Sequence, residues 1–242
     1  MIRTAVILAA GMGTRLKGLV GDIPKGLISF AGQTLIERSI LQLCEQGIER
    51  ILIVTGHLAH HYKRMAEDHP SIELIHNREY ARSGSMYSFF CCRDMIQEDI
   101  LLLESDLIYE TRGLTALLSS GVPDQILISG DTDSGDEVYV ETLDGRITGL
   151  SKNKAELGHV AGELVGISKF SKSFCSRMFA EAGNLFRKSL MVEYEQCVVQ
   201  AASHHPVYFL KIDDLVWAEI DDENHLNRVK EKILPSLKIK SE

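Results

Sequence analysis

The sequence lacks the features of secreted and membrane-spanning proteins. Its five cysteines are odd in number, scattered along the chain and without metal-ligand spacing, which indicates free thiols in a reducing compartment. No apolar run is long enough to span a bilayer, and the apolar N-terminal stretch leads into a glycine turn instead of a cleavage site. We therefore expect a cytoplasmic protein with no membrane partner.

An excess of basic residues is also missing, since the formal net charge is −8. Proteins that bind nucleic acid usually carry a basic excess that displaces counterions, so we expect no nucleic-acid partner. Hydrophobic residues make up 45% and charged residues 25% of the chain, enough for one sizeable core. A length of 242 residues suits a single domain over residues 1–242. The sequence leaves the oligomeric state open, a homo-oligomer included.

Apolar runs rich in β-branched residues alternate with segments of helical period in the first half of the chain. This alternation predicts βαβ units and a mainly parallel sheet. The predicted strands are residues 4–9, 51–54, 72–75 and 100–104, and the predicted helices are residues 34–46, 58–68 and 86–95.

Beyond residue 124 the pattern changes to short strands separated by turns, which indicates an antiparallel extension of the same sheet. A hairpin turn is expected at Leu143–Arg146, and a final helix from Asn224 should stop at Pro235. The tail after it is expected to fray. The predicted fold class is therefore α/β: one Rossmann-like domain with a mixed, mainly parallel sheet flanked by helices, and a small antiparallel extension.

A glycine-rich turn, Leu8–Leu16, follows the first predicted strand directly. Gly11 and Gly13 let the backbone approach a ligand closely and present N–H groups to phosphate oxygens. It is not a Rossmann fingerprint, because Leu16 stands where G-x-G-x-x-G has its third glycine. Taken alone, such a turn can also serve only to join a strand to a helix.

Two acidic segments add a second kind of chemistry. The strand at residues 100–104 runs into Ser105 and Asp106, and ligands of open α/β sheets lie beyond such carboxyl ends. A carboxylate there suits Mg²⁺, although an acidic residue can also merely end a strand. The other segment is Trp217-Ala218-Glu219-Ile220-Asp221.

The string L-A-A-G-M-G-T-R-L, with Pro-Lys ten residues after its arginine, resembles the signature of the sugar-phosphate nucleotidyltransferases. The resemblance implies the nucleotide-diphospho-sugar transferase fold. It also implies that Arg15 holds the β- and γ-phosphates and that Lys25 neutralises the α-phosphate during transfer. The W-x-E-I-D segment resembles the one that supplies a second metal carboxylate in this superfamily, so Asp106 and Asp221 are the implied Mg²⁺ ligands.

Within the superfamily, the stretch from His76 to Ser88 resembles the N-x-x-Y-A…Y-S loop of short cytidylyltransferases that activate phosphocholine or 2-aminoethylphosphonate. This branch holds cytosine with backbone after the first strand and with the loop before the third helix. The serines could equally be plain helix caps. The implied nucleotide-binding residues are Leu8, Ala9, Ala10, Gly11, Gly13, Thr14, Ser83 and Ser88.

Two residues that stand where phosphocholine enzymes have aromatic side chains suggest the acceptor. Quaternary ammonium groups are bound by aromatic rings, whereas a primary ammonium prefers carboxylates. Phosphocholine enzymes have aromatic residues at the positions of Val138 and Glu195. Relatives place a lysine against the acceptor phosphate where Lys152 stands in this chain. Lys154 is the alternative candidate for that role. The implied acceptor-binding residues are Glu137, Lys152, Tyr194 and Glu195.

The sequence thus predicts a cytidylyltransferase that moves CMP from CTP to 2-aminoethylphosphonate and releases pyrophosphate, with phosphocholine or phosphoethanolamine as alternative acceptors. Residues 1–124 would bind the nucleotide and residues 125–235 the acceptor. A hexose-1-phosphate transferase and a non-catalytic nucleotide sensor are the remaining alternatives. The combination of Arg15, Lys25, Asp106 and Asp221 argues against a sensor. The scattered histidines, among them His205, are expected at the surface.

Overall fold

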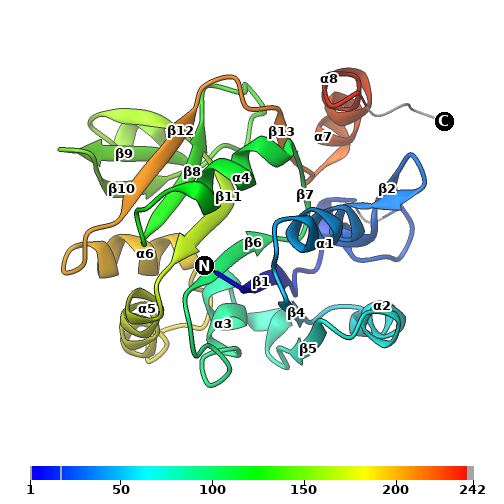
Figure 1. The fold of residues 1–242 in the computed structure, drawn as a ribbon, viewed down its shortest axis with the longest axis horizontal. Helices are drawn as coiled ribbons and strands as arrows, with labels where there is room; N and C mark the ends of the chain where they lie inside the picture. The colour runs from blue at the N-terminus through cyan, green and yellow to red at the C-terminus, as the bar shows by residue number, and fades with distance from the viewer. Residues whose placement is uncertain (1, 17, 239–242) are drawn as a thin grey trace.

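The computed structural model describes residues 2–16 and 18–238, which are organised around a nine-stranded sheet (Figure 1). The strand order across the sheet is β5-β4-β1-β6-β11-β8-β12-β10-β9. The strands are β1 Thr4–Ala9, β4 Arg50–Thr55, β5 Ile72–His76, β6 Ile100–Glu104, β8 Gln125–Ser129, β9 Tyr139–Leu143, β10 Arg146–Ser151, β11 Val160–Phe170 and β12 Tyr208–Ile212.

The sheet is parallel at one side and mixed at the other. Strands β5, β4, β1 and β6 are parallel, whereas β11 is antiparallel to both β6 and β8. Strand β12 is parallel to β8, and the β9–β10 hairpin pairs with β12 through β10 and with β11 through β9. The predicted α/β fold with an antiparallel extension is confirmed, and the extension closes into a circuit of five strands.

Helices cover both faces of the sheet because side chains alternate between the faces along each strand. On β1, Val6 and Leu8 pack in one core and Ala5 and Ile7 in the other. The first core lies under α3 (Ser85–Phe90), α5 (Lys172–Leu185) and α6 (Tyr194–Ala202). The second lies under α1 (Leu35–Glu45) and α4 (Thr111–Ser119), next to α2 (Lys63–Asp68).

Local sequence signals explain where several elements begin. Helix α1 starts with a capping box, in which the Thr34 hydroxyl accepts from the Glu37 N–H and the Glu37 carboxylate accepts from the Thr34 N–H. The β9–β10 turn uses Asp144 and Gly145 with φ of 51° and 75°, which is the backbone of a tight hairpin turn. The predicted turn at Leu143–Arg146 is therefore confirmed.

Helix α3 and the C-terminal helices differ from the predictions made from the sequence. Helix α3 ends at Phe90, five residues before its predicted end, and continues as turns. The last helix was predicted to stop at Pro235, but the helical segment continues through Pro235 to Ser236. A π-helical stretch separates α7 from α8, so this proline lies in the first turn of α8, where its missing N–H is tolerated. The predicted frayed tail falls on residues 239–242, outside the described residues. The short elements are β2 Ser29–Phe30, β3 Gln33–Thr34, β7 Leu107–Tyr109, β13 Trp217–Glu219, α7 Glu223–Arg228, the π-helix Val229–Ile233, α8 Leu234–Ser236, and the 3₁₀ turns Thr14–Leu16, Lys25–Leu27, Ala59–Tyr62, Tyr80–Arg82 and Lys154–Glu156.

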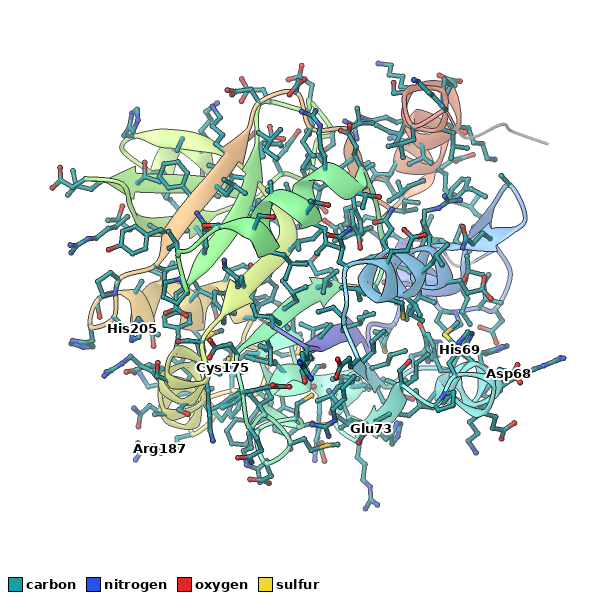
Figure 2. All side chains as sticks on the ribbon, in the orientation of Figure 1. Asp68, His69, Glu73, Cys175, Arg187 and His205 are labelled. Atoms are coloured by element: carbon teal, nitrogen blue, oxygen red, sulfur yellow. The ribbon has the colours of Figure 1, made fainter. Side chains whose placement is uncertain are left out.

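The structure also shows the state of the cysteines and the surroundings of His205. All five cysteines are free, and Cys175 is buried on α5 (Figure 2). His205 is partly exposed, and its ring nitrogen contacts the buried Asp124 carboxylate at 2.7 Å. The same carboxylate accepts from the Ser171 N–H at the start of α5. None of the helices in the described ranges is long and apolar enough to cross a membrane.

Candidate active site

One cavity of about 460 Å³ opens where the parallel strands β1 and β6 end. The register that pairs Leu8 with Glu104 brings the glycine-rich turn beside the acidic end of β6. The pair β13 and β7 adds the Glu219 and Asp221 side chains from the far end of the chain. Apart from Glu137 and the alternative lysine Lys154, every site residue predicted from the sequence lines this cavity.

Lys25 lies between the two aspartates that were predicted to hold metal. Its ammonium is 3.0 Å from the Asp106 carboxylate and also donates to Asp221. Burial alone would lower the pKa of Lys25, but the two aspartates outweigh burial and raise it. Burial would likewise raise the pKa of Asp221, yet the Lys25 charge holds that pKa at about 2. Lys25 therefore stays protonated and lines the cavity as a positive charge.

Arg15 and Lys152 are joined by a carboxylate that the sequence analysis did not select. The Arg15 guanidinium is 2.9 Å from Asp221 and 2.8 Å from Asp136. The Lys152 ammonium is 2.7 Å from the other oxygen of Asp136. Carboxylates and cations thus alternate across the cavity from Asp106 to Lys152, so each predicted phosphate-binding cation has an anionic partner in this ligand-free arrangement.

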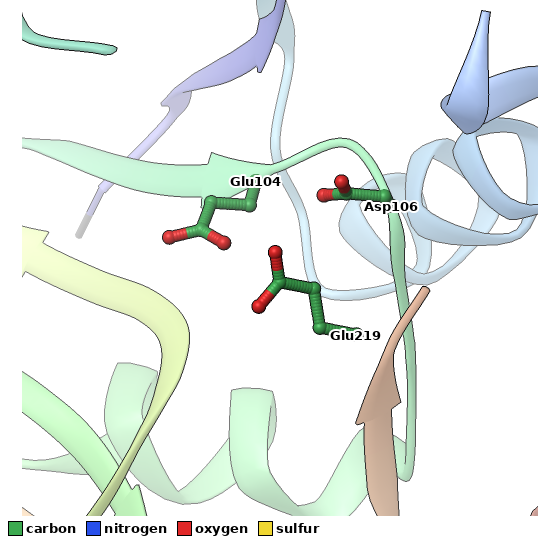
Figure 3. A group of neighbouring side chains, drawn as sticks. All are labelled: Glu104, Asp106 and Glu219. Atoms are coloured by element: carbon green, nitrogen blue, oxygen red, sulfur yellow. The ribbon is translucent and has the colours of Figure 1, made fainter. Parts of the chain in front are cut away.

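A second acidic group lies on the other side of Asp106. Oxygens of Glu104, Asp106 and Glu219 lie within 4.8 Å of one another, and Figure 3 shows the three carboxylates pointing to a common centre. Burial and the neighbouring carboxylates raise the pKa of Glu104 to about 8 and that of Glu219 well above its ordinary value. The three carboxylates outnumber the Lys25 ammonium that contacts Asp106, so the chemistry of this all-oxygen group fits a hard divalent cation such as Mg²⁺.

Sequence analysis missed Glu104 and Glu219 although both lie in the motifs that it used. Glu104 ends strand β6 two residues before Asp106, and Glu219 ends strand β13 two residues before Asp221. That two-residue spacing was the signal available in the sequence. The assignment of metal to Asp106 and Asp221 stays a prediction, with Glu104 and Glu219 as further candidate ligands.

Space for the Glu104 carboxylate depends on Gly166 in β11. This residue has φ of +81°, and a Cβ there would lie 3.0 Å from the carboxyl carbon of Glu104. The β8–β11 register shifts around it, between Leu164 and Ser168. A side chain at this position would be strained and would push against the acidic group.

The predicted base-binding serines are held by one asparagine. The buried Asn77 side chain donates to the hydroxyls of Ser83 and Ser88, each at 3.0 Å. Neither serine caps α3, whose N-cap is Gly84 without a side-chain hydrogen bond. The helix-cap alternative is therefore wrong for α3, while a role in binding cytosine stays a prediction.

The Gly84 loop is fixed against the predicted acceptor segment. A Cβ at Gly84 would lie 2.4 Å from the carbonyl oxygen of Val192. Backbone hydrogen bonds join Gly84 to Leu190 and Met86 to Val192. Nucleotide and acceptor residues predicted from distant segments are thus parts of one rigid wall.

At the acceptor end, the Tyr194 hydroxyl donates to Glu104 at 2.7 Å. The Oε2 atom of Glu195 is buried and has no hydrogen-bond partner among residues 2–16 and 18–238. Burial raises the pKa of Glu195 to about 7 despite the nearby Lys152 charge. Tyr194, Glu195 and Lys152 line the main cavity together, as predicted.

Two predicted acceptor residues differ in position from the rest. Glu137 lines a smaller adjoining cavity of about 60 Å³, which shares Glu104 and Glu195 with the main one. Its carboxylate accepts from the Gly135 N–H, so it is partly engaged by its own loop. Lys154, the substitute for Lys152, lies over the Tyr139 ring at 5.0 Å and does not line the main cavity.

Comparisons with known proteins agree with this geometry. A family model described as the MobA-like NTP transferase domain matches residues 5–207. The 2-aminoethylphosphonate cytidylyltransferase of Lancefieldella rimae is 31% identical over 176 residues, which cover 72% of this chain and 69% of that protein.

Two solved structures share the fold. The inositol-1-phosphate CTP transferase from T. maritima superposes with a TM-score of 0.83 at 20% identity, over 100% of this chain and 98% of that chain. The CTP:phosphocholine cytidylyltransferase from Streptococcus pneumoniae gives 0.78 at 22% identity, over 95% and 99%. This chain is thus a nucleotidyltransferase that belongs to the MobA-like NTP transferase domain family, within its branch of short cytidylyltransferases.

Proposed function

We propose that the chain transfers CMP from CTP to a small phosphorylated or phosphonylated primary amine, with 2-aminoethylphosphonate as the preferred acceptor. The products would be CMP-2-aminoethylphosphonate and pyrophosphate. The observation that carries this proposal is the order of charges in one cavity. Lys25, Arg15 and Lys152 follow one another along it, joined by the carboxylates of Asp221 and Asp136. The Lys152 charge also acts on Glu195, whose buried Oε2 atom has no hydrogen-bond partner among the described residues.

The cations suit a reaction between two anions. Arg15 and the N–H groups of the glycine-rich turn would hold the outer phosphates, and Lys25 would neutralise charge at the α-phosphate. Lys152 would hold the acceptor phosphonate. The attacking oxygen is already anionic, so the residues need only align the two groups and neutralise charge, without a general base.

The acidic group supports a divalent cofactor. Glu104, Asp106, Glu219 and Asp221 are the residues that would hold Mg²⁺. When bound, Mg²⁺ would supply charge neutralisation and orientation for the phosphates. Lys25 pairs with Asp106 and Asp221 in the same place, and its charge holds the pKa of Asp221 at about 2.

The acceptor end suits a primary ammonium. An N–H donor can satisfy the unpartnered Glu195 oxygen, and its positive charge would offset the burial that raises the pKa of Glu195 to about 7. A trimethylammonium offers no N–H donor. Val138 in the adjoining cavity supplies no aromatic face for it. A relative named as a 2-aminoethylphosphonate cytidylyltransferase supports the same choice. Phosphocholine and phosphoethanolamine are the alternatives, and a hexose 1-phosphate ranks below them.

Pyrophosphate release from CTP and Mg²⁺ tests the proposal directly. The acceptors compared would be 2-aminoethylphosphonate, phosphoethanolamine, phosphocholine and glucose 1-phosphate, against a reaction without acceptor. We expect the two primary amines to exceed phosphocholine in kcat/KM by roughly tenfold to a hundredfold. A preference for phosphocholine would refute the choice of acceptor but not the transferase. No pyrophosphate with any acceptor would refute the proposal as a whole.

Two variants locate the ammonium site. Glu195→Gln should reduce the preference for a primary amine, since it weakens the charged hydrogen bond. Glu193→Gln is the matched control, because the Glu193 carboxylate is already engaged by the N–H and hydroxyl of Ser85. It should leave the ratio between phosphoethanolamine and phosphocholine unchanged. If both variants change that ratio equally, Glu195 does not bind the ammonium.

A further inference from the structure

A fully buried hydroxyl without a partner lies in the floor of the active-site cavity. Tyr62, at the end of the 3₁₀ turn Ala59–Tyr62, has no exposed surface and lines the cavity. Its hydroxyl forms no hydrogen bond within the described part of the chain. Buried polar groups in folded proteins are nearly always paired, so one that is left unpaired at an active site needs a functional explanation. Phenylalanine would fill the same space without leaving a donor unpaired.

The position of this hydroxyl connects it with the two turns that carry the central charges. A Cβ on Gly26 would lie 3.2 Å from the Tyr62 hydroxyl and 3.1 Å from the Ser105 carbonyl oxygen. Gly26 follows Lys25 directly, and Ser105 precedes Asp106. The Tyr62 hydroxyl therefore lies at the junction of the Lys25 turn and the Asp106 turn.

The hydroxyl keeps its proton at any working pH. Burial, and then the negative charge of Asp106, raise the pKa of Tyr62. It can therefore act as a hydrogen-bond donor toward an anion but not as a base. In the ligand-free arrangement, Asp106 already has a donor in the Lys25 ammonium at 3.0 Å.

We propose that Tyr62 is a positioning residue, whose hydroxyl donates to the Asp106 side of the site when Lys25 turns from Asp106 to a phosphate. The proposal rests on the proposed function, because transfer requires Lys25 to neutralise phosphate charge. Without another donor, Asp106 would lose a charge-assisted hydrogen bond at that moment. A replacement bond of ordinary strength would contribute about tenfold to the population of the aligned site, equivalent to about 1.4 kcal/mol.

Tyr62→Phe tests this role because stability and activity should change in opposite directions. In metal-free buffer the variant should unfold at the same or higher denaturant concentration, since an unpaired buried donor has been removed. Its kcat should fall about tenfold with KM for CTP within about threefold, and the Mg²⁺ concentration for half-activation should rise several-fold. The thermal stabilisation that Mg²⁺ and CTP together give should also shrink, which is a readout that requires no acceptor.

Tyr109→Phe is the matched control. The Tyr109 hydroxyl is also buried, beside Ser39, and meets no hydrogen-bond geometry among the described residues. It does not line the cavity, so its removal should change none of the kinetic or ligand-induced values. An unchanged kcat and Mg²⁺ dependence in Tyr62→Phe would overturn the proposal. Loss of stability in the metal-free variant would also overturn it, since the hydroxyl would then be an ordinary structural donor. If the unmodified enzyme releases no pyrophosphate with any acceptor, the proposed function fails instead, and the ligand-induced stabilisation alone decides the role of Tyr62.

Discussion

The acidic group predicts an unusual dependence of stability on pH in the metal-free protein. Glu104 has a pKa of about 8 in the folded chain, against an ordinary value of 4.5, because it is buried beside Glu195 and Asp106. Folding therefore favours the protonated carboxyl. The stability contributed by this proton is fully present below about pH 4.5 and is lost as the pH rises through about 8. Glu195 and Glu219 are shifted in the same direction.

The size of the effect follows from the number of protons involved. Between about pH 4.5 and pH 8 the folded chain holds one more proton on Glu104 than the unfolded chain does. Each unit of rising pH therefore lowers the free energy of unfolding by at most about 1.4 kcal/mol. Glu104 is partly open to the solvent in the cavity, which screens its charge, so about 1 kcal/mol per unit is a realistic slope. Glu104→Gln keeps an acceptor for the Tyr194 hydroxyl but cannot titrate. It should exceed the unmodified protein in stability by about 3 kcal/mol at pH 8 and match it near pH 5.

Denaturant unfolding with a chelator, at intervals between pH 5 and pH 8.5, measures this slope. Addition of Mg²⁺ should flatten the curve of the unmodified protein, because the metal favours ionised carboxylates. Gly183→Ala, in an exposed part of α5 where an added Cβ meets nothing within 4 Å, is a control that should leave the slope unchanged. Parallel curves for Glu104→Gln and the unmodified protein would refute the reasoning, as would stability that rises between pH 5 and pH 8.

Three further outcomes follow from the same geometry. Lys25→Ala should lose at least about a hundredfold in kcat with a circular-dichroism spectrum that still shows the fold, because this lysine supplies charge to the reaction more than packing. Asp221→Asn should raise the Mg²⁺ concentration for half-activation several-fold, since it removes an anionic oxygen, and an unchanged Mg²⁺ titration would contradict this. Gly84→Ala should lower the free energy of unfolding by about 2 kcal/mol or more, measured by denaturant titration, because its Cβ would lie 2.4 Å from the Val192 carbonyl oxygen.

The parallel half of the fold was predictable because its signals are local. Buried strands such as β1 and β6 are continuous apolar runs, and α1 carries its own capping box in Thr34 and Glu37. The segment that became β7 and α4 was harder, because the first is three residues long and pairs with β13, more than a hundred residues away. Short strands defined by a distant partner leave little periodic pattern in a sequence.

The candidate site likewise has residues that could be predicted from local sequence and residues that could not. The glycine-rich turn with Arg15 and Lys25 is contiguous, so its chemistry could be predicted from residue types and spacing. Asp136 could not, because it lies in a loop without periodicity and its partner Arg15 is 121 positions away. Only the closure of the β9–β10 hairpin against β11 and β12 brings this carboxylate over the cavity.

The position of Asp136 also explains how cations that suit phosphates can lie close together in a protein with a net charge of −8. Two cations within reach of one phosphate would repel each other in an empty cavity, but a carboxylate between them removes that repulsion. Asp136 contacts Arg15 through one oxygen and Lys152 through the other. On the proposed function, substrate binding exchanges one anion for another at these cations, so they are already oriented and little side-chain ordering remains to oppose binding. The acidic balance of the chain is thus compatible with anionic substrates, because the carboxylates keep the cations in place until phosphates replace them.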